Sequence, residues 1–78
     1  MMPKHLTGRQ KQIYRAIKDF TAEHHRSPSE RELAALCDIA YVSVVSYNLL
    51  VLQSKGFIKL EPRLSRTIHI IRSLEEEI

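Results

Sequence analysis

The spacing of apolar residues along the chain predicts three helices followed by a β-hairpin. In the first segment, over about residues 8–25, apolar residues recur at helical spacing and would form one buried face, made of Ile13, Ala16, Ile17 and Phe20. Thr7 and Gln10 have the spacing of a capping box, in which each residue bonds the backbone of the other. The helix is therefore expected to start there, and Pro28 cannot continue it.

A second, shorter helix is predicted directly after this proline. Ser29 and Glu32 form another capping box, ahead of a helix over about residues 30–37. Its inner face is expected to consist of Leu33, Leu36 and Cys37. A tight turn at residues 38–40 would then end it.

The third helix is expected over about residues 41–55, with Gly56 at the position where a left-handed cap is common. A stripe at helical spacing would pack it on the first two helices, formed by Val45, Leu49 and Leu52. Two helices joined by so short a connector indicate a helix-turn-helix. A helix-turn-helix is used mostly to lay its second helix in the DNA major groove. Residues 39–53, where that helix would lie, include no charged residue.

Beyond Gly56 the apolar period changes to two, which predicts a β-hairpin. In the first strand Ile58 and Leu60 alternate with Lys59 and Glu61, and in the second Ile68 and Ile70 alternate with His69. A polar link at residues 62–66 contains a proline, as a hairpin loop often does. The fold class predicted is mainly α with a small β-hairpin, a winged helix-turn-helix over residues 1–72, followed by a short acidic tail at 73–78.

Composition narrows the function classes only modestly. The chain has 78 residues, enough for one small domain, with 12 basic against 9 acidic residues and a net charge of +3. Three of the acids lie at residues 75–77, so the body of the chain is more basic than the total suggests and is compatible with nucleic acid. Cys37 is the single cysteine, and the sequence contains neither a membrane-spanning apolar run nor a signal-peptide pattern. A cytoplasmic protein with no membrane association is expected.

Several short motifs resemble the N-terminal DNA-binding domain of LexA-type repressors, over nearly the whole chain and without gaps. They are Leu6-Thr7-x-Arg9-Gln10, Pro28-Ser29-x-x-Glu32-Leu33-Ala34, Leu49-x-x-Leu52-x-x-Lys55-Gly56-Phe57-Ile58 and Ser65-Arg66-x-Ile68. The resemblance implies a DNA-binding transcriptional regulator, most simply a repressor, whose third helix reads bases in the major groove. The base-reading positions fall on Tyr41, Ser43, Val44, Ser46 and Tyr47.

This sequence departs from the family in two respects. The repressors carry polar and acidic residues at the base-reading positions, where this chain has aromatic, β-branched and hydroxyl residues, so the SOS operator is not expected to transfer. LexA also continues into a self-cleaving peptidase domain that supplies dimerisation. Nothing follows Ile78 here, so a standalone domain without that peptidase is expected.

Contacts to DNA phosphates are expected to supply most of the affinity and its salt dependence. The predicted phosphate-binding residues lie at the start of the first two helices, at the base of the hairpin and in its loop: Arg9, Ser29, Arg31, Lys55, Lys59, Arg63 and Arg66. Without Arg or Lys in the third helix, the commonest guanine contact is missing, which favours A/T-leaning sites with contacts to thymine methyl groups. Asn48 could pair with adenine, but it lies beyond the usual reading positions, so capping or solvent exposure is expected for it.

The apolar third helix also supports an alternative, a small protein-interaction module. Outward-facing apolar residues on a small domain often mark a protein interface, and those expected here are Tyr41, Val44, Tyr47, Leu50 and Val51. The partners considered are therefore double-stranded DNA, a second copy in a homodimer, and another protein. No enzyme activity, small-molecule substrate, cofactor or metal site is expected, because His24 and His25 point to different faces and no glycine-rich phosphate loop is present.

Overall fold

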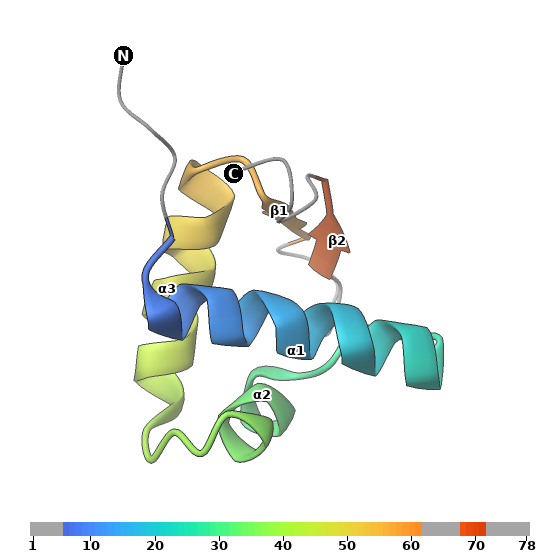
Figure 1. Cartoon of the computed structure of the whole chain (residues 1–78), viewed down its shortest axis with the longest axis horizontal. Coiled ribbons are helices and arrows are strands. Elements are labelled where there is room, and N and C mark those ends of the chain that lie inside the picture. The colour runs from blue at the N-terminus through green and yellow to red at the C-terminus, as the bar shows by residue number, and fades with distance from the viewer. Residues whose placement is uncertain (1–5, 62–67, 72–78) are drawn as a thin grey trace.

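The computed structural model describes residues 6–61 and 68–71, in which three helices precede a two-stranded antiparallel sheet (Figure 1). The elements are α1 (Gly8–His24), α2 (Glu30–Leu36), α3 (Val42–Ser54), β1 (Ile58–Leu60) and β2 (Ile68–Ile70). This order confirms the predicted winged helix-turn-helix class. Every helix boundary lies within one residue of the position that the sequence predicts.

Both predicted capping boxes are present. The Thr7 hydroxyl accepts a hydrogen bond from the Gln10 backbone N–H, and the Thr7 N–H donates to the Gln10 side chain, each over 3.1 Å. At α2, the Ser29 N–H donates to Glu32 over 2.7 Å and the Glu32 N–H donates to the Ser29 hydroxyl over 3.0 Å. These bonds satisfy amides that the first helical turn leaves unpaired, so local sequence sets where α1 and α2 begin. α3 starts differently, because its N-cap Tyr41 makes no side-chain cap bond.

The turns after α2 and α3 share one geometry. In each, a residue with positive φ, Asp38 at 56° and Gly56 at 83°, ends the helical path. The next residue then donates its N–H to a carbonyl of the last helical turn, over 2.8 Å for Ile39 and 3.0 Å for Phe57. This is the Schellman arrangement, in which the residue after the left-handed position packs back on the helix. Both Ile39 and Phe57 are buried, so each turn returns the chain to the core.

The core lies where the three helices and the hairpin meet. The predicted inner stripe of α3 is buried, and Tyr14 of α1 packs edge-on against Phe57 with ring centroids 6.1 Å apart. The predicted inner face of α1 was incomplete, because Tyr14 is 1% exposed whereas Phe20 is only half-buried. The predicted inner face of α2 was wrong at Leu36, which is 57% exposed. The buried face of this short helix runs through Leu33, Ala34 and Cys37 instead.

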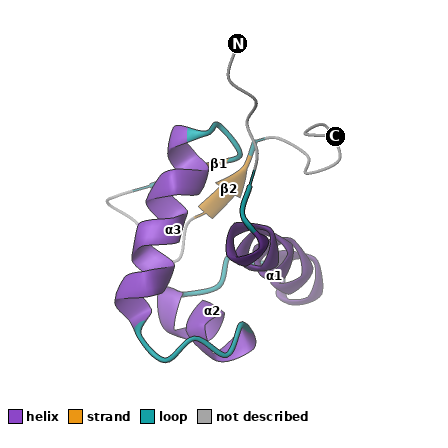
Figure 2. Cartoon of the chain, turned by 60° about the vertical axis from the view of Figure 1, so that its left-hand side comes forward, coloured by secondary structure: helices purple, strands orange, loops and turns teal. Residues whose placement is uncertain are grey.

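The hairpin packs beside α3 (Figure 2). Its register pairs Ile58 with Ile70, Lys59 with His69, and Leu60 with Ile68. Ile58 and Ile68 are buried, whereas Ile70 is exposed.

One side chain from outside the hairpin fixes β2. The Ser27 hydroxyl donates to the Ile68 carbonyl and accepts from the Ile68 N–H, each over 3.0 Å. The loop between α1 and α2 therefore supplies hydrogen bonds to the backbone of β2. The predicted loop at residues 62–66 and the tail at 73–78 lie outside the described residues.

Candidate nucleic-acid interface

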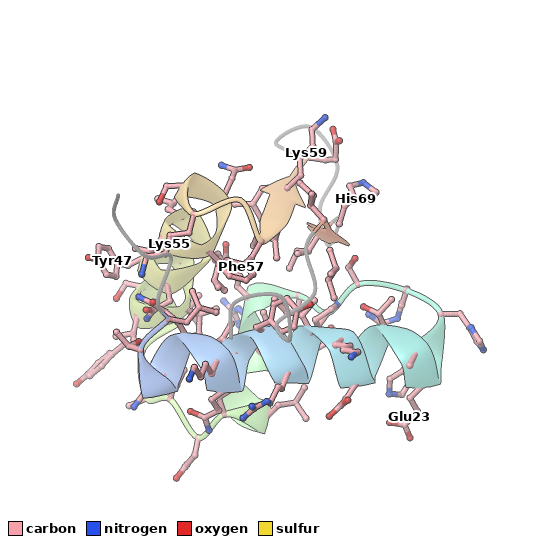
Figure 3. The ribbon with its side chains drawn as sticks, turned by 45° about the horizontal axis from the view of Figure 1, so that its top comes forward. Glu23, Tyr47, Lys55, Phe57, Lys59 and His69 are labelled. Carbon is pink, nitrogen blue, oxygen red and sulfur yellow. The ribbon has the colours of Figure 1, made fainter. Side chains whose placement is uncertain are left out.

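The outward side of α3 carries most of the predicted base-reading residues. Tyr41 is 72% exposed and Tyr47 is 65% exposed, and Ser43 and Val44 are also exposed. In Figure 3, Tyr47 lies on the side of the molecule opposite Glu23, which marks the far end of α1. Four of the five predicted residues thus share a solvent-facing surface at the start of α3, made of hydroxyl, aromatic and branched aliphatic groups.

Ser46 is the exception among these five. It is half-buried, and its hydroxyl donates a short 2.6 Å hydrogen bond to the Glu30 carboxylate at the start of α2. The bond ties the two helices of the helix-turn-helix together. Because a serine hydroxyl has a single hydrogen to donate, Ser46 can only accept further hydrogen bonds while this bond is present.

Asn48 does not take the cap or solvent position expected for it. It is 7% exposed, donates to the Val44 carbonyl over 2.8 Å and accepts from the Gln10 amide over 3.3 Å. The physical reason is its register: positions 45, 48, 49 and 52 follow the spacing of one helix face, so Asn48 belongs to the inner stripe. That spacing was visible in the sequence, and Gln10 supplies the partner that a buried amide requires.

The predicted phosphate-binding residues of α1, α3 and β1 remain accessible to different degrees. Arg9 and Lys59 are exposed, whereas Lys55 is half-buried with its ammonium 3.4 Å from the Gln10 side-chain oxygen. Lys59 lies 3.9 Å from Glu61, a carboxylate that also lies 3.8 Å from His69. The hairpin base therefore carries mixed charge. Arg63 and Arg66 lie outside the described residues.

The start of α2 is already occupied by a protein carboxylate. Glu32 forms a two-pronged pair with Arg26, over 3.0 and 3.2 Å, and also accepts from Ser29. The hydrogen bond from Arg26, assisted by the bond from Ser29, lowers the pKa of Glu32 to about 2. Because Glu32 supplies the negative charge that this helix start favours, Arg31 is a better predicted phosphate contact there than Ser29. Arg31 is exposed.

A second surface feature lies between α1 and α2. A groove of about 500 Å³ separates α1 from the end of α2, and its lining mixes Arg15, Asp19 and Glu23 with the apolar Leu36. Burial raises the pKa of the Cys37 thiol at its edge, which disfavours a nucleophilic thiolate. Within residues 6–61 and 68–71, no three His, Cys, Asp or Glu side chains gather as metal ligands would, and no helix has the length and apolarity to cross a membrane.

Comparison with known proteins identifies the family. Residues 3–67 match the model of the LexA DNA binding domain, which takes in the helix-turn-helix and the first strand of the hairpin. The chain belongs to the LexA DNA-binding domain family. This relationship confirms the resemblance that the motifs indicated.

The similar full-length proteins are LexA repressors. The chain is 46% identical to the LexA repressor of Roseiflexus sp. (strain RS-1) over 65 residues, which are 83% of this chain and 30% of that repressor. It is 40% identical to the LexA repressor of Herpetosiphon aurantiacus over 68 residues, covering 87% of this chain and 32% of that protein. The LexA repressor of Staphylococcus carnosus is 38% identical over 72 residues, 92% of this chain and 35% of the repressor. The chain thus spans about a third of the length of these relatives.

Proposed function

We propose that this domain is a sequence-specific double-stranded DNA-binding regulator that represses transcription, with α3 placed in the major groove. The observation that carries the proposal is the exposed start of α3, held between α2 and the hairpin in a chain that belongs to the LexA DNA-binding domain family. An α-helix fits the major groove, and a helix-turn-helix presents the start of its second helix to base edges. Repression follows from the relatives, which are repressors.

Backbone contacts would come from basic residues around α3. Arg9, Arg31 and Lys59 are exposed on three different elements, and Arg63 and Arg66 belong to the hairpin sequence. Each phosphate contact that releases a counterion steepens the salt dependence of binding by about 0.9 in the log–log slope. A single domain of this size makes few contacts, so tight binding would require two copies on adjacent half-sites.

The experiment is a salt titration of duplex DNA binding with the whole chain and a double variant. Arg63→Ala with Arg66→Ala should weaken binding to all sequences alike and lower the slope by roughly one unit for each lost phosphate contact. The matched control is Arg15→Ala with Lys18→Ala, which removes two exposed positive charges from α1 and should leave the slope unchanged.

An unchanged slope in the double variant would show that these arginines do not touch phosphate. If the wild-type chain shows neither sequence preference nor salt-sensitive binding, the proposal fails as a whole. The protein-interaction module then becomes the favoured function, because Tyr47 and Leu50 form an exposed apolar surface on α3.

A further inference from the structure

We infer that α3 recognises its DNA site chiefly through the methyl groups of thymine, and that guanine and adenine are not read by paired hydrogen bonds from this helix. The inference rests on the proposed function and specifies the chemical class of site: half-sites rich in T·A pairs where α3 lies. It follows from which side chains the fold leaves on the outer surface of α3 and which it draws inward.

Guanine is read most often by the paired donors of arginine or by lysine. α3 offers neither, because no charged residue lies between Asp38 and Lys55. Lys55 follows the last turn of the helix, and its ammonium is 3.4 Å from the Gln10 side chain. The start of the helix, which meets the bases in this fold, therefore has no cation.

Adenine is read most often by the amide of asparagine or glutamine. The two amides of α3 are both engaged within the protein. Asn48 is buried, donating to Val44 and accepting from Gln10. Gln53 accepts the Leu60 backbone N–H over 2.8 Å at the far end of the helix, which fixes its amide toward the hairpin.

Cytosine is read by an acceptor such as a carboxylate, and α3 itself contains no acidic residue. At the start of α2, Glu30 accepts the Ser46 hydroxyl over 2.6 Å, which uses the one donor that Ser46 has. The exposed remainder at the start of α3 consists of Val42 and Val44, the rings of Tyr41 and Tyr47, and the Ser43 hydroxyl.

These remaining groups select for a methyl group more than for a hydrogen-bonding pattern. A thymine presents its C5 methyl in the major groove, and the branched side chain of Val44 provides apolar surface for it. Serine and tyrosine hydroxyls both donate and accept, so they discriminate little among bases. Burying one methyl group corresponds to about a fourfold change in affinity.

The test begins by selecting bound sequences from a random duplex pool with the whole chain. Each thymine of the enriched half-site is then replaced by deoxyuridine, which removes the methyl and keeps the base pair. We expect the affinity to fall about fourfold when one thymine under α3 is replaced and about fifteenfold when two are replaced. Replacement at flanking positions should leave the affinity unchanged. An enriched site whose affinity does not change with uracil overturns the inference while leaving DNA binding intact. Absence of any enriched site overturns the proposed function itself.

A protein variant then assigns the methyl contact. Val44→Ala should lower the affinity for the thymine duplex about fourfold. It should have little effect on the affinity for the duplex with uracil at the contacted position, because the methyl group that Val44 contacts is already absent there. Leu50→Ala is the matched control, since Leu50 is exposed on α3 beyond the reading positions and its loss should affect both duplexes equally. Equal losses on both duplexes for Val44→Ala would overturn the assignment.

Discussion

Replacing Ser27 with alanine should loosen the hairpin without touching the core. Ser27 lies in the loop between α1 and α2, and its hydroxyl holds both backbone polar groups of Ile68, the first residue of β2. Alanine removes this hydroxyl and leaves the Ile68 N–H and carbonyl without their partner. Because the strand has three residues, a defect at its first position affects much of the pairing.

The size of the effect can be worked from the two hydrogen bonds, each 3.0 Å long. A net contribution of about 0.5–1.5 kcal/mol for each gives a loss of about 1–3 kcal/mol in the free energy of unfolding. A domain of this size has a total stability near the low end of about 5–15 kcal/mol, so the loss is a large fraction. At about 4–8 °C per kcal/mol, the melting temperature should fall by at least about 4 °C.

The assay is thermal and urea unfolding followed by circular dichroism, for the wild type and three variants. Ser54→Ala is the matched control, because its exposed hydroxyl donates to the Val51 carbonyl within the same helix and holds no second element. Ser27→Thr retains a hydroxyl and should recover much of the stability that Ser27→Ala loses. The alanine variant should also bind DNA more weakly, since the hairpin carries Lys59 and continues into the sequence of Arg63 and Arg66.

The result that refutes this reasoning is a melting temperature for Ser27→Ala within error of that for Ser54→Ala. Solvent would then satisfy the Ile68 backbone as well as the hydroxyl does, and β2 would be held by side-chain packing alone. A loss in Ser27→Thr as large as in Ser27→Ala would point instead to the space around the residue.

Two further predictions separate stability from recognition. Asn48→Ala should leave the Gln10 amide N–H without its acceptor and lower the free energy of unfolding, measured in urea, by about 1–3 kcal/mol. The bases preferred in a binding selection should not change. Altered base preference at unchanged stability would contradict the inward placement of Asn48. The pKa of Glu32 is lowered from 4.5 to about 2 in the folded domain, so its stabilising effect is fully present above about pH 4.5 and is lost as the pH falls toward 2. The melting temperature of Glu32→Gln should therefore lie below that of the wild type at pH 5–7 and approach it near pH 2, and a constant difference down to pH 2 would show that the ionised pair with Arg26 is not its source.

The parts of the fold that the sequence predicts are those determined by neighbouring residues. The capping boxes and the glycine turn at Gly56 depend on residues only a few positions apart, and the structure has them all. The inner stripe of α3 follows from helical spacing alone. These features set the helix boundaries to within one residue.

The features that the sequence does not predict depend on contacts between distant segments. Nothing near Ser27 shows that its hydroxyl will meet Ile68, 41 residues further along. Whether Leu36 or Ala34 completes the buried face of α2 depends on how the helix is rotated against α1 and α3, which a helix of seven residues does not fix by itself. Asn48 fits the inner spacing, but a polar residue becomes acceptable there only because Gln10 of α1 supplies its partner.

The same distant contacts explain how a domain of this family can change its base preference and keep its fold. α3 is held to α1 through Gln10 and Asn48, to α2 through Ser46 and Glu30, and to the hairpin through the buried Phe57. These attachments use the inner face and one border of the helix. The exposed side chains of Tyr41, Ser43, Val44 and Tyr47 take no part in them, so substitutions at those four positions change the outer surface of the helix at little cost in stability. On the proposed function, the uncharged outer surface of α3 would therefore alter which DNA site is bound and leave the fold intact.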